Sequence, residues 1–217
     1  MEVAELRPRL WRWTATHPDW TPEEGGQDGW EPDVSSYALV EEDTLVLIDP
    51  LVPAGEEERF WRALDEDVEH HGAPHILLTV FWHARSAQTI LDRYPGAAVW
   101  APAAAEAQAR ERVDLAHTYG HGDRLPGGIE GRATEHRAEA LLWIPTHSAL
   151  AAGDLLLGTP GGGVRVCPDS WLRSGVTPRH LRDGLRHLID LPVELLLLTH
   201  GEPILDGARA KLEAAVG

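Results

Sequence analysis

The spacing of hydrophobic residues changes several times along the chain, and each change predicts a different element. Apolar runs with strand character occupy much of the first fifty residues. A helical spacing follows, with Phe60, Leu64 and Val68 four residues apart on one face. The elements predicted for the first half are strands at 9–17, 34–40, 44–49, 76–80 and 97–102, and helices at 55–72, from 86 onward, and at 103–113.

Strands crowd together in the second half, and helices return near its end. The predicted strands are 129–136, 139–145, 149–158, 163–168 and 194–203, and the predicted helices are 177–190 and 206–217. Thr177 suits an N-cap and Pro178 the first turn of the helix that follows. This order indicates an α/β protein with two sheets packed face to face and helices outside. Because no Pro/Gly/Ser linker divides the chain, we expect one domain over residues 1–217.

Composition narrows the range of partners. No apolar run approaches the roughly 20 residues of a membrane helix, and the amino terminus lacks the apolar core of a secretion signal, so we expect a cytoplasmic protein without a membrane partner. The net charge of −16, with 19 scattered basic residues, argues against nucleic acid as a partner. Cys167 is the one cysteine, which excludes an internal disulfide and a cysteine-based zinc cluster.

The segment VFWHARS, residues 80–86, places Trp82, His83 and Arg85 where the strand predicted at 76–80 ends. In layered α/β architectures, ligands and catalytic groups collect at the carboxyl ends of strands. Taken alone, the segment favours an ordinary loop that exposes one histidine and one arginine.

Three other polar residues end or interrupt apolar strands in the same way. His136 closes GRATEH, Asp154 lies within ALAAGDLLLG, and His200 closes ELLLLTHG. An ionised carboxylate in such a strand needs a partner, because burying it unpaired is very costly. Histidine and aspartate are common metal ligands, although so long a spacing is by itself a weak signal.

The segments LVLIDP, ILLTVFWHARS, EALLWIP with the histidine before it, ALAAGDLLLG and LLLLTHGEP resemble, in order and spacing, the landmarks of the metallo-β-lactamase superfamily. The resemblance runs from about Val34 to Pro203. It implies a four-layer αββα sandwich. Typical members bind two metals, usually zinc, with a bridging hydroxide that attacks esters, amides, thioesters or phosphoesters.

The resemblance also implies roles for individual residues. Asp49 matches an aspartate at the end of an early strand that is generally structural or supports the ligands. His136 matches a ligand of the first metal, Asp154 the carboxylate that bridges both metals, and His200 the last ligand of the second.

The segment 80–86 departs from the family pattern. The family signature there is H-x-H-x-D-H after a threonine, and with Thr79 aligned the four ligand positions fall on Val80, Trp82, Ala84 and Arg85. None of these four is an ordinary zinc ligand. The sequence therefore predicts a largely dismantled two-metal centre in a non-hydrolytic relative that has no metal cofactor and serves as a small-molecule-binding or interaction protein.

Two substitutions are expected to fill the place of the metals. Arg85 puts a permanent cation near Asp154, and we expect its guanidinium to pair with that carboxylate. Trp82 is expected to fill much of the first metal site. The remaining carboxylate oxygen of Asp154 is expected to accept a hydrogen bond from His200 or His136.

An alternative retains one metal. Alternation along a strand turns His83 away from the site, but a one-residue bulge would turn it inward. His83, His136, Asp154 and His200 could then hold one zinc, iron or manganese ion in a divergent metal-dependent hydrolase.

Tryptophans are numerous, at nine in 217 residues. Trp20 and Trp30 lie in an early loop that in the resembled family can overhang the site. We expect both to line a pocket for an apolar or aromatic small molecule.

Overall fold

The computed structural model describes residues 2–26, 28–134, 138–172 and 175–217 of the chain. The strands are β1 Val3–Arg7, β2 Leu10–Thr16, β3 Asp33–Glu41, β4 Thr44–Ile48, β5 His75–Leu77, β6 Ala98–Pro102, β7 Leu115–Tyr119, β8 Glu130–Ala133, β9 Ala140–Ile144, β10 Ala149–Ala151, β11 Leu156–Thr159, β12 Gly163–Val166 and β13 Leu195–Leu197. The helices are α1 Glu57–His71, α2 Ala87–Arg93, α3 Glu106–Arg110, α4 Pro178–Leu185 and α5 Ala208–Val216, with short 3₁₀ turns between elements.

The larger sheet has seven strands in sequence order, β1 to β7. Strands β1 to β4 pair antiparallel, whereas β4, β5, β6 and β7 pair in parallel through helical crossovers. Among the parallel strands, β4 and β5 are rich in Val, Ile and Leu, as expected for strands buried on both faces. Because these two strands run parallel, their carboxyl ends meet at one edge of the sheet, where β4 ends at Ile48 and β5 at Leu77.

The second sheet has the strand order β13-β10-β9-β8, and β11 and β12 form a separate hairpin beside it. Strand β10 pairs antiparallel with β9 and parallel with β13. All five residues of β9 are buried, because helices cover one face of this sheet and the larger sheet covers the other.

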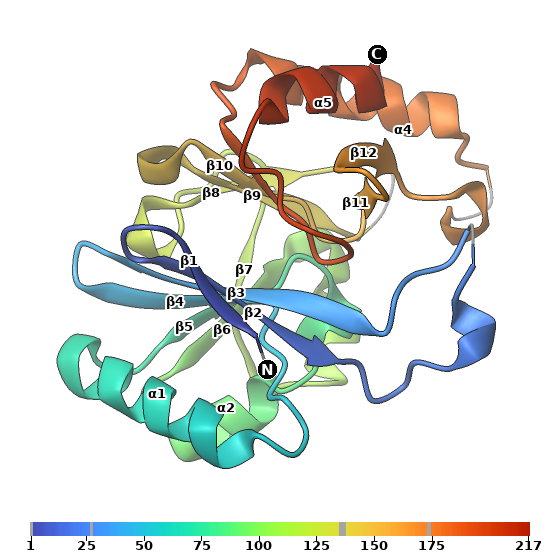
Figure 1. Ribbon diagram of the computed structural model, residues 1–217. Helices are drawn as coiled ribbons and strands as arrows, with labels where there is room; N and C mark the ends of the chain where they lie inside the picture. The colour runs from blue at the N-terminus through green and yellow to red at the C-terminus, as the bar shows by residue number, and fades with distance from the viewer. Residues whose placement is uncertain (1, 27, 135–137, 173–174) are drawn as a thin grey trace.

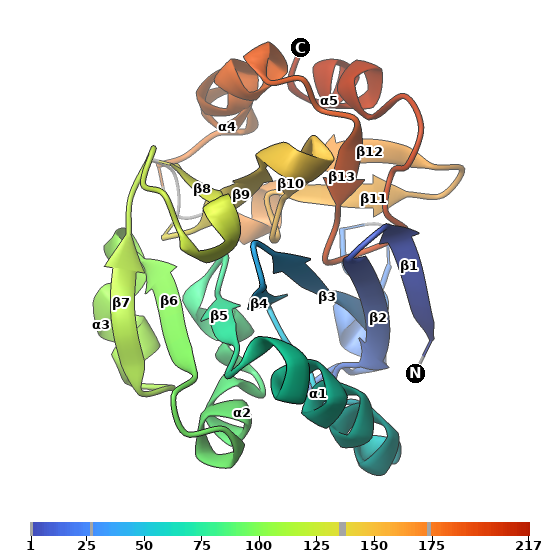
Figure 2. The ribbon, with the colours of Figure 1, turned by 90° about the vertical axis from the view of Figure 1, so that its left-hand side faces the viewer.

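Three apolar clusters separate four layers (Figures 1 and 2). One lies between the two sheets, a second between the larger sheet and α1 to α3, and a third between the second sheet and α4 and α5. Helix α1 contributes Phe60 and Leu64, each of which stabilises the fold by about 1.5–3 kcal/mol on burial. The αββα sandwich predicted from the sequence is confirmed.

Some element boundaries differ from those predicted. Strands β1 and β7 were not predicted, since neither has a strong alternating apolar pattern. The strand predicted at 149–158 is divided into β10 and β11 by a turn that contains Asp154. The strand predicted at 76–80 ends at Leu77, and the alanine-rich helix is a 3₁₀ turn followed by the short α3.

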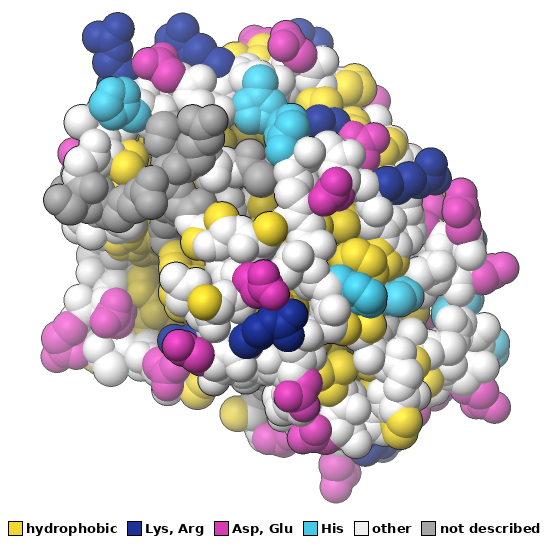
Figure 3. All heavy atoms as spheres, turned by 180° about the vertical axis from the view of Figure 1, so that it is seen from behind, with side chains coloured by type: hydrophobic (Ala, Val, Ile, Leu, Met, Phe, Trp, Pro, Cys, Tyr) yellow, Lys and Arg dark blue, Asp and Glu magenta, His cyan; other side chains and the backbone are white. Residues whose placement is uncertain are grey.

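No helix of the described residues is long and apolar enough to span a membrane. On the face drawn in Figure 3, acidic and basic side chains are interspersed, and the described residues form no continuous basic stripe there.

Candidate functional site

Thr79 joins the two sheets at the edge where β4 and β5 end. Its main-chain oxygen accepts a hydrogen bond from the amide of Ala140, at 2.9 Å, and Val80 forms a bridge with Glu139. Asp49, directly after β4, donates its amide to the oxygen of Leu77 at 3.1 Å. The ends of both parallel strands and the start of β9 therefore converge on one point.

Asp49 is buried, and both of its carboxylate oxygens accept hydrogen bonds. Its Oδ1 accepts the amide of Thr79 at 2.8 Å, and its Oδ2 accepts the Thr79 hydroxyl at 2.5 Å. The backbone of Asp49 has a φ of 48°, a conformation that non-glycine residues adopt at a cost. The carboxylate thus fixes the segment after β5 and presents its remaining lone pairs to one further side chain, His83.

His83 lies between two carboxylates. Its Nδ1 is 2.9 Å from Oδ2 of Asp49, and its Nε2 is 3.2 Å from Oδ1 of Asp154. The side chain is only 2% exposed. Burial, and then the charge of Arg85, lower the pKa of His83, but the two carboxylates outweigh them and raise it to about 9.

The inward direction of His83 differs from the default prediction that it faces away from the site. That prediction assumed that strand alternation continues past Val80. Residues Phe81–Ala84 instead form a 3₁₀ turn, in which successive side chains are about 120° apart. The turn brings His83 inward and still directs Trp82 to the same carboxylate.

Asp154 is held in the turn between β10 and β11 by Glu139. One carboxylate oxygen of Glu139 accepts the amides of Asp154, at 2.5 Å, and Leu155, at 2.9 Å. The preceding residue, Gly153, has a φ of 53°, and a Cβ there would lie 2.6 Å from the same Glu139 oxygen and 2.8 Å from the hydroxyl of Thr79. Only glycine fits, so the position of Asp154 is fixed by its local backbone.

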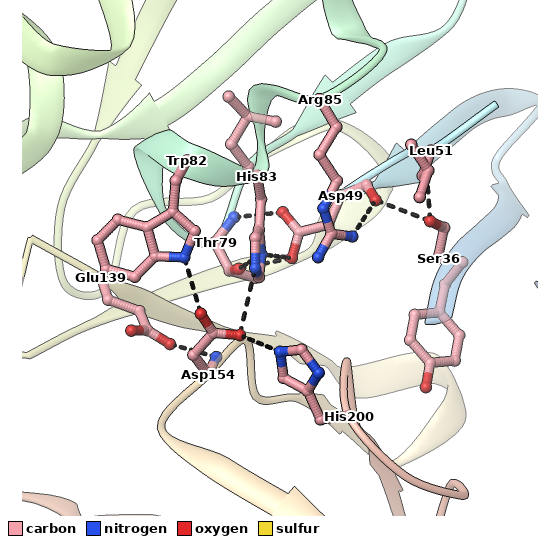
Figure 4. A network of polar contacts seen from close by, with 12 residues as sticks. Ser36, Asp49, Leu51, Thr79, Trp82, His83, Arg85, Glu139, Asp154 and His200 are labelled. Carbon is pink, nitrogen blue, oxygen red and sulfur yellow. Dashed lines mark hydrogen bonds and ion pairs between the residues drawn. The ribbon is translucent and has the colours of Figure 1, made fainter. Parts of the chain in front are cut away.

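Three side chains meet the carboxylate of Asp154, which is 4% exposed (Figure 4). The indole of Trp82 donates to Oδ2 at 2.7 Å, while Nε2 of His83 and Nε2 of His200 lie 3.2 and 3.1 Å from Oδ1. Burial raises the pKa of Asp154, but the charge of His83 and the contact with the His200 imidazole outweigh it and hold the pKa well below its ordinary value. Asp154 is therefore an ionised carboxylate with nitrogen groups on both oxygens.

The chain reversal after β13 places His200 at this carboxylate. Gly201 has a φ of 90°, and a Cβ on it would lie 2.9 Å from the Cα of Gly158. This close approach allows the amide of Gly158 to donate to the oxygen of His200 at 2.9 Å. Burial lowers the pKa of His200, partly opposed by its contact with the Asp154 carboxylate. The structure brings His200 beside Asp154, with Nε2 3.1 Å from Oδ1 as an ion-pair contact, but Oδ1 has no hydrogen-bond partner among the described residues. His136, the alternative donor, lies outside the described residues.

Arg85 does not occupy the position predicted for it. Among the described residues, the groups on the Asp154 carboxylate are Trp82, His83 and His200, and the Arg85 guanidinium donates to the main-chain oxygen of Asp49 at 3.3 Å. The backbone of Arg85 turns into positive φ, 31°, immediately after the 3₁₀ turn, and this change of direction carries the side chain to Asp49. In Figure 4 the guanidinium lies on the side of His83 away from Trp82.

A pocket of about 770 Å³ lies over this network. Trp82, His83, Arg85, Asp154 and His200 line it.

Tryptophan rings from two loops also contribute to the pocket wall. Trp30 lines it as predicted, and its ring centroid is 5.1 Å from that of His200. Trp20 is not among the lining residues, because its indole donates to the main-chain oxygen of Trp30 and thereby supports the loop from behind. Trp171 and His17 also line the pocket and were missed, since nothing in their local sequence brings them to this edge.

The described residues do not fit a two-metal centre. Of the four aligned ligand positions, Val80 and Ala84 are buried apolar residues, and Trp82 offers a hydrogen-bond donor rather than a lone pair. No group of three or more His, Cys, Asp or Glu side chains among the described residues is arranged to hold a metal ion. Both ring nitrogens of His83 face carboxylates, which suits hydrogen bonding within the protein.

No protein-family model matches the sequence, and no curated protein matches it. Solved structures do match. The FIM-1 metallo-β-lactamase of Pseudomonas aeruginosa in its mono-zinc form has a TM-score of 0.70 at 10% identity, with 98% of this chain and 92% of that one covered. The metallo-β-lactamase family protein TTHA1429 of Thermus thermophilus has a TM-score of 0.65 at 19% identity, with 97% and 79% covered.

The Flv1 flavodiiron core of Synechocystis sp. PCC6803 has a TM-score of 0.71 at 15% identity, with 98% of this chain and 59% of that one covered. Identities this low carry the fold alone. The layered architecture and these comparisons together show that the chain has the metallo-β-lactamase fold.

Proposed function

We propose that this chain is a divergent member of the metallo-β-lactamase superfamily that binds a small molecule and has lost the two-metal hydrolytic centre. The observation that supports this most strongly is the environment of Asp154. In the residue aligned with the bridging carboxylate, Oδ2 accepts a hydrogen bond from the indole of Trp82, and Oδ1 lies within ion-pair distance of the imidazoles of His83 and His200. Side-chain nitrogens thus stabilise the charge that metal ions would otherwise neutralise.

Polar contacts also fix the residues around this carboxylate. The hydroxyl of Thr79 donates to Asp49, the carboxylate of Asp49 contacts His83, and the carboxylate of Glu139 accepts the amide of Asp154. These hydrogen bonds fix the positions of the side chains around Asp154, although Oδ1 of Asp154 itself has no hydrogen-bond partner among the described residues. The network thus supports a pocket floor that is held without a bound ion.

The pocket itself supports a binding role. Its volume of about 770 Å³ lies within the range of about 300–1,000 Å³ that is usual for small-molecule sites. Its wall combines the indole rings of Trp30, Trp82 and Trp171 with numerous charged and polar side chains. Aromatic surface beside placed polar groups is common in sites that bind organic molecules.

A second candidate function is a hydrolase with one metal, and one observation favours it. The Nδ1 of His83 contacts the carboxylate of Asp49, which is the arrangement that commonly orients a metal-binding histidine. His83, Asp154 and His200, with His136 from outside the described residues, would hold a zinc, iron or manganese ion that activates water.

Hydrolysis assays test the choice between these functions. The parent protein and Asp154→Asn are incubated with chromogenic ester, thioester, amide and phosphoester substrates, each with and without added zinc, iron or manganese. We expect the same background rate from both proteins under every condition. Metal-dependent turnover that is lost in Asp154→Asn would establish the second candidate instead.

A thermal-shift screen tests the binding role. Compounds that raise the melting temperature of the parent protein are tested again on Trp171→Ala, which removes a pocket wall that takes no part in the polar network. We expect hits that stabilise the parent and lose their effect on the variant. Hits that stabilise both proteins equally, or a screen without hits, would count against this pocket as a binding site.

A further inference from the structure

Arg85 is a cation in the pocket wall that the protein only partly satisfies. Its one hydrogen bond to a described residue runs from a terminal nitrogen to the main-chain oxygen of Asp49 at 3.3 Å, which is long for such a bond. Its Nε is buried and has no acceptor among the described residues. A guanidinium has five N–H donors in a planar fork, so most of its hydrogen-bonding capacity remains available.

Arg12 shows how the same chain satisfies a buried arginine completely. Its Nε donates to the hydroxyl of Ser35 at 2.9 Å, and its two terminal nitrogens donate to the carboxylate of Glu202 at 2.7 and 3.0 Å. The paired carboxylate is the element that Arg85 lacks. The nearby carboxylates of Asp49 and Asp154 are already engaged by other side chains.

Further donors lie in the same pocket. Ser86, next in the chain, accepts the amide of Val52 at 2.9 Å, and its hydroxyl hydrogen has no acceptor among the described residues. Nδ1 of His17 accepts the amide of Asp19 at 3.2 Å, which leaves the hydrogen of the neutral ring on Nε2. Burial, and then the charge of Arg85, lower the pKa of His17 and favour that neutral form.

Aromatic rings stand beside these donors. The ring centroids of Trp30 and Trp171 lie 5.1 and 5.8 Å from that of His200, so both indoles sit at the same end of the pocket. Indole faces bind flat apolar groups with little loss of conformational entropy. The pocket therefore combines a donor cluster with an aromatic wall.

The acidic residues of the pocket restrict the charge of a ligand. Asp19 and Glu24 line the pocket, and Asp154 lies in its floor. Arg112 also lines the pocket, but it is exposed and its guanidinium lies over the ring of Phe81, 5.4 Å from the centroid. A polyphosphate or other polyanion would be repelled by the three carboxylates, whereas a single carboxylate would match the largely unpaired guanidinium of Arg85.

From these contacts we propose that the pocket binds a small aromatic monocarboxylate, with its carboxylate on the guanidinium of Arg85 and its ring against Trp30 and Trp171. This inference rests on the proposed small-molecule-binding function and adds the class of ligand to it. In this proposal the guanidinium of Arg85 is a ligand-binding group that lies beside the polar network of Asp154.

Calorimetric titration tests the ligand class with four probes: indole-3-acetate, its neutral analogue indole-3-acetamide, the cation tryptamine, and inorganic phosphate. We expect the parent protein to bind the acid at least about tenfold more tightly than the amide, since hydrogen bonds to charged groups are the stronger ones. Arg85→Gln should remove this preference. Arg179→Gln should keep it, because Arg179 is 88% exposed on α4, outside the pocket lining.

Each other result overturns the inference. Equal binding of acid and amide to the parent protein, a measurement that needs no variant, excludes an anion site, as does a preference that survives in Arg85→Gln. If tryptamine or phosphate binds more tightly than indole-3-acetate, the pocket takes a different class of ligand. If indole-3-acetate does not bind at millimolar concentration, aromatic monocarboxylates are excluded as ligands. If indole-3-acetate and indole-3-acetamide bind the parent protein equally and neither binds Trp171→Ala, the ligand class is wrong but the proposed binding function stands. Metal-dependent hydrolysis would instead remove that function itself.

Discussion

Replacing His83 by glutamine tests whether a charged imidazole between two carboxylates stabilises the fold. Glutamine is similar in size and keeps hydrogen-bonding groups but lacks the charge. The side chain of His83 is 2% exposed and its nitrogens lie 2.9 and 3.2 Å from Asp49 and Asp154. The pKa of His83 is raised from 6.5 to about 9, which corresponds to ~3 kcal/mol of stability in the charged form. Breaking a buried ion pair costs a similar amount, about 3–5 kcal/mol.

The sign of the pH dependence follows from the direction of this shift. The folded protein holds a proton on His83 that the unfolded chain releases above its ordinary pKa of 6.5. The contribution is therefore complete below pH 6.5 and is lost as the pH rises toward about 9. We expect the free energy of unfolding of the parent protein to fall across this range by ~3 kcal/mol more than that of His83→Gln.

Urea denaturation followed by circular dichroism at a series of pH values measures both effects. His147→Gln is the matched control, because Nε2 of His147 lies 2.8 Å from a single carboxylate oxygen, that of Glu41, away from the pocket. It should cost less than His83→Gln, because the imidazole of His147 faces one carboxylate and that of His83 faces two. The reasoning is refuted if His83→Gln is as stable as the parent at pH 6, or if the two proteins show the same pH dependence.

Two further substitutions test the placement of the central carboxylate. Trp82→Phe removes the indole donor to Asp154 and should lower the free energy of unfolding by about 1.5–3 kcal/mol more than Trp11→Phe does. Trp11 is the control because its indole has no hydrogen-bond acceptor among the described residues. Equal losses in the two variants would show that the hydrogen bond to Asp154 contributes nothing. Gly153→Ala should lower the melting temperature more than Gly161→Ala, since both positions have positive φ but only the first would force a Cβ against Glu139; equal decreases would show that the close approach is not limiting.

The sequence predicted the layers because apolar periodicity is a local property. The four-residue spacing from Phe60 and the β-prone block at 76–80 are both visible without knowledge of the fold. Strand β7 was missed because its middle residues, Ala-His-Thr, are exposed or half-buried and show no alternating apolar pattern, and because its partner β6 lies before the intervening α3 in the chain.

The site was only partly predictable, because apolar periodicity does not specify the direction of individual polar side chains. Asp154 and His200 could be matched by order and context, and the structure brings them together. The directions of His83 and Arg85 depend on a 3₁₀ turn and a positive φ that no apolar periodicity encodes. Trp171 reaches the pocket through the packing of a distant loop, which the local sequence does not specify.

Metal content tests the central claim, that side-chain donors have replaced the metal ions on Asp154, most directly. Untagged protein is purified without chelator from cells grown with added zinc, iron and manganese, and each metal is quantified by inductively coupled plasma mass spectrometry, with Asp154→Asn prepared in parallel. We expect far less than one metal ion per chain, at the same level in both proteins. One or more ions per parent chain, lost in Asp154→Asn, would contradict it and identify a metal centre.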